Sequence, residues 1–150
     1  MNIGIVKENR HSESRVSLTP DSISKLINLG NHKFSIVKDA GIKSGFENKE
    51  YQDSGVQIIE NNKQLILNNQ LIISVNPIEN SYYKHFSPQS ILISNFETFS
   101  DTKCVQLLIQ NNITGLALER IPRIARAQSM DVLSSQASVS GYKSVLIAAS

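Results

Sequence analysis

The chain has 150 residues, of which 40% are hydrophobic and 19% are charged, and its formal net charge is +2. That length suits a single domain with a buried core. The lysines and arginines are scattered along the chain, so no basic stripe points to nucleic acid as a partner. Met1 leads directly into an apolar segment, and no apolar run reaches the ~20 residues that cross a bilayer. We therefore expect a soluble, cytoplasmic protein.

The chain predicts strands and helices in alternation. Thr19, Pro20 and Asp21 supply an N-cap, a first-turn proline and a first-turn acid, and Gly30 is a plausible helix end. Apolar runs without two-residue alternation predict buried strands at residues 2–7, 34–37, 56–59, 71–75, 91–93 and 113–118. Further helices are expected at residues 49–53, around 65–67, at 82–86 and at 101–110. This order predicts an α/β fold: a mostly parallel open sheet with helices on both faces, in a Rossmann- or flavodoxin-like lobe.

The pattern changes after Pro122. Residues 126–149 follow helical spacing, are rich in serine and alanine, and show no further strand. We expect an α/β lobe over residues 1–125 and a long connector helix over residues 126–150 that leads toward a further lobe.

Most catalytic motifs are missing from the chain. It has no glycine-rich dinucleotide fingerprint, no P-loop, no nucleophile elbow and no zinc motif. His11, His32 and His85 have no partner at metal-ligand spacing, so no metal site is expected. The single cysteine, Cys104, lies in an apolar run and is expected to be a buried, inert thiol.

One polar segment, residues 119–135, follows the last predicted strand, where open α/β sheets bind ligands. Gln128, Asp131 and Ser135 have the spacing of one helical face. Arg123 could fold back to Asp131 or reach a ligand carbonyl with its forked donors. The residues alone leave two interpretations open: a polar binding site, or helix capping beside a solvated basic turn.

Residues 122–135, PRIARAQSMDVLSS, closely resemble a loop of the NAD(P) transhydrogenase alpha subunits. Residues 1–20 resemble the opening that these proteins share with alanine dehydrogenases, and residues 41–55 resemble the next block of the same superfamily. The resemblance covers the whole chain. It identifies the chain as similar to the N-terminal lobe of that subunit.

The resemblance implies a role for each residue of this loop. Arg123 would contact the nicotinamide carboxamide, and Gln128 would lie between the two nucleotides at the site of hydride transfer. Asp131 would orient the loop, and these three residues are the expected catalytic set. The expected cofactor-binding residues are Arg123, Ile124, Ala125, Gln128, Ser129, Met130, Asp131 and Ser134, with Ala125 at a position where the family usually has serine.

The resemblance also implies a larger assembly. NAD(H) would bind this component, in part through a second lobe that carries the missing glycine-rich fingerprint. NADP(H) would bind a separate beta component, and a membrane component would couple hydride transfer to proton movement. The chain would then be cytoplasmic and peripheral to the inner membrane through its partners, with a homodimer as a further arrangement. On its own it should bind NAD weakly or not at all.

Two alternatives remain open. The first is a non-catalytic interaction or regulatory lobe. The second is the lobe of an alanine-type amino-acid dehydrogenase, in which a lysine and a histidine handle pyruvate. The corresponding positions here fall at about Asn76 and Glu97, and neither side chain can take the role of that lysine or histidine. Arg15 is retained, but one arginine cannot carry out the reaction alone.

Overall fold

Six parallel strands form one open sheet in the order β3-β2-β1-β4-β5-β6. The computed structural model describes residues 1–97 and 102–149. The strands are β1 Asn2–Ile5, β2 Lys33–Val37, β3 Gln57–Ile59, β4 Leu71–Ile73, β5 Ile91–Ser94 and β6 Thr114–Ala117. The predicted α/β class with a parallel sheet is confirmed, and the order is that of a doubly wound Rossmann fold.

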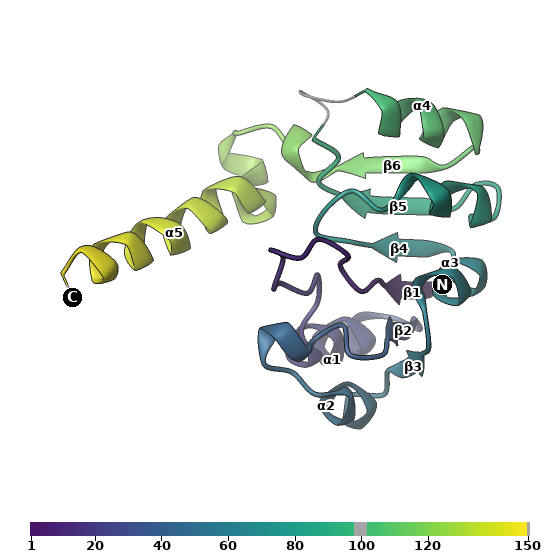
Figure 1. Ribbon diagram of the computed structural model, residues 1–150, viewed down its shortest axis with the longest axis horizontal. Coiled ribbons are helices and arrows are strands. Elements are labelled where there is room, and N and C mark those ends of the chain that lie inside the picture. The colour runs from purple at the N-terminus through teal and green to yellow at the C-terminus, as the bar shows by residue number, and fades with distance from the viewer. Residues whose placement is uncertain (98–101, 150) are drawn as a thin grey trace.

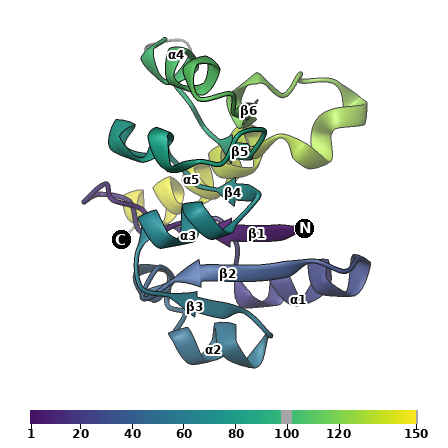
Figure 2. The same ribbon diagram turned by 90° about the vertical axis from the view of Figure 1, so that its right-hand side faces the viewer.

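Helices cover both faces of the sheet (Figures 1 and 2). On one face, Ile23 of α1 and Tyr51 of α2 pack with Ile5 and Ile36 of the sheet. On the other face, Leu65 of α3 and Leu108 of α4 share a core with residues of β4 and β5. The α-helices before the last one are α1 Pro20–Leu29, α2 Asn48–Asp53, α3 Asn62–Asn68 and α4 Lys103–Gln110.

The sequence signals of α1 work as predicted. Thr19 accepts a hydrogen bond from the backbone N–H of Ser22 through its side chain, and Pro20 occupies the first turn. Ile23 is fully buried. Gly30 ends the helix with extended backbone rather than with a left-handed turn. The predicted start of the helix at residues 101–110 lies at Asp101, outside the described residues.

β1 and β4 each end two residues earlier than predicted, because side chains take over the backbone hydrogen bonds that would continue the strands. β1 stops at Ile5, and Asn62 then exchanges two hydrogen bonds with the backbone of Lys7, both at 2.9 Å. β4 stops at Ile73, and the next free backbone N–H groups donate to the side chain of Glu8. The helix predicted at 82–86 is a 3₁₀ helix, η2, over Asn80–His85.

The last helix, α5, spans Val132–Ala148 and begins six residues later than the sequence predicted. The preceding segment instead forms the short 3₁₀ helices η3 Leu118–Arg120 and η4 Ala125–Met130. None of the residues of α5 is buried, and the helix points away from the sheet (Figure 1).

Candidate functional site

The strand order reverses between β1 and β4, and the loops that follow these two strands diverge there. In doubly wound sheets, ligands bind at the carboxyl ends of the strands beside this reversal. Several cavities adjoin the loop after β1 at this edge in the described parts of the chain, and two of them lie on opposite sides of that loop.

The larger cavity, of about 460 Å³, lies between the loop after β1 and the start of α5, and we call it the α5 cavity. Its volume is within the range of small-molecule sites. Ser74 in its wall is only 1% exposed, and its hydroxyl has no hydrogen-bond partner among the described residues. The wall is formed by Arg15, Val16, Ser17, Thr19, Ser44, Phe46, Ile73, Ser74, Val75, Asn95, Leu118, Glu119, Val132, Leu133 and Gln136.

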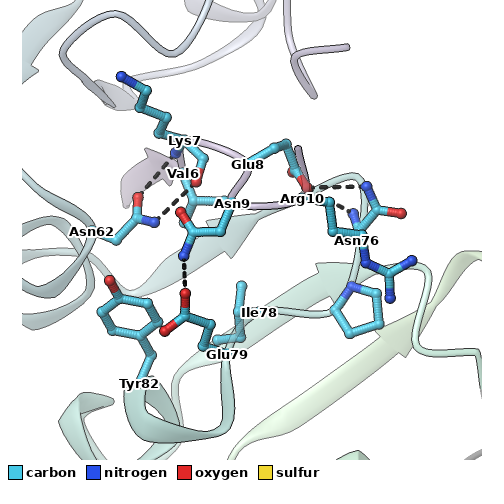
Figure 3. A pocket seen from close by; sticks show the side chains of 11 residues that line it. Val6, Lys7, Glu8, Asn9, Arg10, Asn62, Asn76, Ile78, Glu79 and Tyr82 are labelled. Atoms are coloured by element: carbon cyan, nitrogen blue, oxygen red, sulfur yellow. Dashed lines mark hydrogen bonds between the residues drawn. The ribbon is translucent and has the colours of Figure 1, made fainter. Parts of the chain in front are cut away.

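The smaller cavity, of about 270 Å³, lies on the other side of the same loop (Figure 3). Its polar side chains largely satisfy one another. Asn62 bonds to the backbone of Lys7, and the side-chain amide of Asn9 donates to Glu79 at 2.6 Å. These contacts hold the loop after β1 against α3 and η2.

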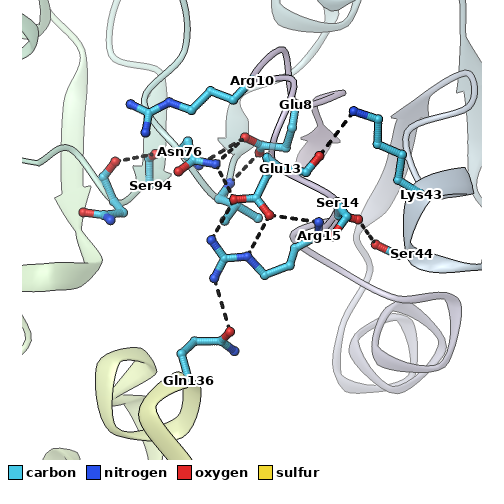
Figure 4. Close-up of polar contacts among 12 residues, drawn as sticks. Glu8, Arg10, Glu13, Ser14, Arg15, Lys43, Ser44, Asn76, Ser94 and Gln136 are labelled. Atoms are coloured by element: carbon cyan, nitrogen blue, oxygen red, sulfur yellow. Dashed lines mark hydrogen bonds and ion pairs between the residues drawn. The ribbon is translucent and has the colours of Figure 1, made fainter. Parts of the chain in front are cut away.

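A chain of hydrogen bonds crosses the site from β4 to the loop after β1 (Figure 4). It begins at Glu8, whose carboxylate accepts the backbone N–H of Val75 at 2.6 Å and both the backbone and side-chain amides of Asn76 at 3.2 Å. Burial raises the pKa of Glu8, and the hydrogen bond from Val75 opposes that rise. Glu8 therefore caps the carboxyl end of β4.

Glu13 is the second carboxylate of this network. The side-chain amide of Asn76 donates to it at 2.7 Å, so Asn76 bridges Glu8 and Glu13. Arg15 donates from both Nε and Nη2, at 2.8 and 2.7 Å, in a forked pair. The hydrogen bonds from Arg15 lower the pKa of Glu13 to about 2. The charge of Arg15 is thus already balanced within the chain.

Arg15 also reaches the last helix. Its Nη1 donates to Oε1 of Gln136 at 3.2 Å. Figure 4 shows the guanidinium group between Glu13 above and Gln136 of α5 below. This contact joins the loop after β1 to α5, and both residues line the α5 cavity.

The loop predicted to bind a nicotinamide lies before α5 and is open to solvent. Arg123, Ala125, Gln128 and Ser129 are exposed, as are Ile124 and Met130, each 57% exposed. Ala127 is 5% exposed and is the inward-facing residue of η4. The loop is therefore anchored at its centre and presents its polar side chains outward.

Asp131 caps α5. Its carboxylate accepts the backbone N–H of Ser134 at 3.0 Å and the Ser134 hydroxyl at 2.6 Å. The hydrogen bond from the Ser134 hydroxyl is the main cause that lowers the pKa of Asp131, and Arg123 contributes a smaller favourable charge. In the structure Asp131 thus acts as the N-cap of α5.

The prediction that Gln128, Asp131 and Ser135 share one face of a single helix is wrong. Gln128 lies in η4, Asp131 precedes the helix, and Ser135 belongs to α5. The helix starts later than predicted because Asp131 caps it. A side chain that accepts a hydrogen bond from an N–H group of the first turn fixes where a helix begins. Neither Arg123 nor Gln128 lines either cavity described above.

Sequence reasoning missed Glu8, Glu13 and Gln136. Glu8 follows the first predicted strand, and Gln136 lies in the second turn of α5. The rule that ligands bind at strand ends applied to the first strand as much as to the last, and it would have drawn attention to Glu8.

Asn76 and Glu97 occupy the ends of neighbouring strands. Asn76 is 7% exposed and is fully engaged by the two carboxylates, while Glu97 accepts from Arg10 at 2.7 Å. Neither Asn76 nor Glu97 lines the α5 cavity, and the residues that line it include no lysine and no histidine.

Within residues 1–97 and 102–149, no three His, Cys, Asp or Glu side chains lie close enough together to hold a metal ion. In the same ranges, no helix has both the length and the apolar character to cross a membrane. Cys104 is buried as predicted, and its thiol donates to the backbone oxygen of Phe96.

The fold and the site define a class: a doubly wound α/β domain with its polar cleft at the strand-order reversal. The family model described as "Alanine dehydrogenase/PNT, N-terminal domain" matches residues 4–140, and the chain belongs to this family. The NAD(P) transhydrogenase subunit alpha of Cereibacter sphaeroides is 34% identical over 146 residues, which are 97% of this chain and 28% of that protein.

Two solved structures show the same fold. The transhydrogenase from Sinorhizobium meliloti aligns with a TM-score of 0.92 and 29% identity, over 99% of this chain and 44% of the other. An L-alanine dehydrogenase aligns with a TM-score of 0.75 and 26% identity, over 81% of this chain and 33% of the other. The chain thus spans less than half of the relatives that it matches.

Proposed function

We propose that this chain is the first lobe of the NAD(H)-binding component of a proton-translocating NAD(P) transhydrogenase, in which hydride passes between NAD(H) and NADP(H). The observation that carries the proposal is the geometry of the loop before α5. Arg123 and Gln128 stand exposed on a segment that Ala127 anchors on the inside and that Asp131 ends with a helix cap. Such a loop can enter a neighbouring subunit without losing its shape.

The donors of this loop suit a carboxamide. The forked guanidinium of Arg123 can donate to a carbonyl, and the amide of Gln128 can both donate and accept. Ser134 already donates its hydroxyl hydrogen to Asp131, so it would meet a ligand as an acceptor. Ile124, Ala125, Ser129 and Met130 complete the exposed surface of the loop that would face the nicotinamide.

The bound NAD(H) supplies the hydride donor or acceptor carbon of its nicotinamide ring. The residues of this chain then act by orientation and by excluding water. No acid or base has to touch the reacting carbon, and the one carboxylate of the loop, Asp131, is already engaged in the cap of α5.

The proposal includes the rest of the assembly. Residues 126–150 would lead into a second lobe with the glycine-rich pyrophosphate site, and NADP(H) would bind a beta component. A membrane component would hold the cytoplasmic parts at the inner membrane. The chain spans 28% of the Cereibacter sphaeroides subunit and 44% of the Sinorhizobium meliloti structure, which supports further lobes in the working enzyme.

The amino-acid dehydrogenase alternative is disfavoured by the contacts of the cleft. Arg15 is forked to Glu13, and Asn76 is tied to two carboxylates, so an oxo-acid would meet a neutralised arginine and no amine. The better overlay with a transhydrogenase structure than with an alanine dehydrogenase agrees with this preference.

A chimera tests the proposal. Residues 1–150 would replace the matching segment of the Cereibacter sphaeroides alpha subunit, and hydride transfer from NADH to an NADP⁺ analogue would be measured. In this chimera, Gln128→Asn should slow transfer about tenfold or more, because a shortened side chain misplaces the two rings, while NADH affinity changes much less. Gln110→Asn, on an exposed position at the end of α4, is the matched control. Equal rates for Gln128→Asn and the control would refute the assignment.

A further inference from the structure

The helix α5 lacks the packing that normally fixes the direction of a helix. Its 17 residues include no buried one, although the helix carries large apolar side chains such as Val139, Tyr142 and Ile147. The hydroxyls of Ser134, Ser135, Ser138 and Ser144 bond to oxygen atoms within the helix or to its cap Asp131. Helices in proteins gain most of their stability from a packed face, so within this chain the contacts at the start of α5 are the ones that can fix its direction.

The bond from Arg15 to Gln136 runs from the body of the lobe to α5. Gln136 lies beyond the first turn, so this contact acts on the helix at a point separate from its cap. Two fixed points define the direction of a rigid rod, whereas one point leaves it free to swing. The cap at Asp131 is the first point, and the contact with Arg15 is the second.

Arg15 is itself held by several hydrogen bonds. Its Nε and Nη2 are forked to Glu13, Glu13 accepts from Asn76, and Asn76 is bonded to Glu8, which caps β4. The guanidinium group is therefore connected through side chains to the carboxyl edge of the sheet. A planar fork can satisfy a carboxylate on one side and still donate from its remaining nitrogen, which a lysine cannot do in the same geometry.

We propose that Arg15 is a positioning residue that sets the direction of α5 through Gln136, and with it the placement of the loop at residues 123–131. The importance of this placement for nicotinamide binding rests on the proposed function. The tether itself does not, because it is a property of this chain without any nucleotide.

The test measures distances within the 150-residue chain. Spin labels would be placed at Lys25→Cys on α1 and Lys143→Cys on α5, both exposed positions, in a Cys104→Ala background. Pulsed electron–electron double resonance should give a narrow distribution of the distance between the two labels in this doubly labelled parent protein. Gln136→Leu removes the acceptor and should widen the distribution at least about twofold, and Arg15→Lys should do the same because the fork is lost.

Two variants separate the tether from general damage to the fold. Gln136→Glu keeps an acceptor oxygen for Arg15 and should keep the distribution narrow. Arg10→Gln removes another arginine of the same loop, one that pairs with Glu97 rather than with α5, and should also keep it narrow. Circular dichroism would verify that each variant is folded, and Gln136 is exposed, so its replacement leaves the core intact.

Three results would overturn the proposal: a broad distribution in the parent, an unchanged width in Gln136→Leu, or an equal widening by Arg10→Gln. If Arg15→Lys does not fold, the two Gln136 variants decide the question. Because no nucleotide is present, failure of the tether is distinct from failure of the proposed function, which the chimera tests separately.

Discussion

The carboxylate of Asp131 receives both the backbone N–H and the hydroxyl of Ser134, at 3.0 and 2.6 Å. This pair fixes where α5 begins and where the preceding exposed loop ends. It also makes Asp131 a structural part of the site rather than a free acid.

Asp131→Ala should fray the start of α5. An N-cap replaced by alanine loses an accepted hydrogen bond, which corresponds to about a fivefold loss of amide protection in the first turn. Hydrogen exchange at Ser134 and Ser135 measures this loss. Asp131→Asn is the control, since asparagine caps equally well without a charge. Equal protection in the alanine variant and the control would show that the cap does not hold the helix.

The stabilising effect of Glu13 should vanish in acid. The pKa of Glu13 is lowered from 4.5 to about 2 in the folded chain, so the ionised carboxylate favours folding above about pH 5. The benefit is lost as the pH falls from 5 toward 2, because the carboxylate becomes protonated. The difference in Tm between the unmodified chain and Glu13→Gln should therefore shrink over this range. A difference that stays constant with pH would contradict the role assigned to the pair with Arg15.

Tyr83→Phe and Tyr51→Phe should differ in sign. Tyr83 is fully buried and its hydroxyl finds no partner in the described part of the chain, so its removal should be neutral or stabilising by about 1 kcal/mol. Tyr51 donates to the backbone oxygen of Leu18 at 3.0 Å, and its removal should cost about 1 kcal/mol. Urea unfolding measures both. A loss of stability in Tyr83→Phe as large as in Tyr51→Phe would argue for a hidden partner.

Gly4→Ala should destabilise the lobe, whereas Gly141→Ala should not. A methyl group at Gly4 would lie 3.0 Å from atoms of Leu65 and Ile72, in the centre of the sheet, and overpacking of this kind costs about 1–3 kcal/mol. At Gly141 nothing lies within 4 Å, and alanine favours a helix by about 1 kcal/mol. Thermal unfolding measures the loss of stability in Gly4→Ala, and helical ellipticity measures the gain of helix in Gly141→Ala. A stable Gly4→Ala variant would mean that the core can expand at β1.

The chain alone should bind NADH weakly or not at all. Arg123 and Gln128 lie on an open surface, and neither lines the α5 cavity or the smaller cavity, so neither cavity encloses a nucleotide held by these two residues. Calorimetric titration should show little or no heat. Micromolar affinity would mean that this lobe holds the nucleotide without a second one, against the proposed division of the site.

The sequence by itself determined the local elements. Thr19 and Pro20 start α1 and apolar runs form the six strands, because these signals act over a few residues and are read directly from neighbours in the chain. The polar loop at residues 122–135 was also visible, since its residues are contiguous.

Only the tertiary structure decided the order of the strands, the early ends of β1 and β4, and the late start of α5. Each depends on partners distant in sequence or on a choice between competing hydrogen bonds: Asn62 closes β1, Glu8 closes β4, and the cap at Asp131 displaces the predicted helix start. The contact between Arg15 and Gln136 joins residues 121 positions apart. No local pattern encodes such a pair, because it exists only once the sheet has brought the loop and the helix to the same edge.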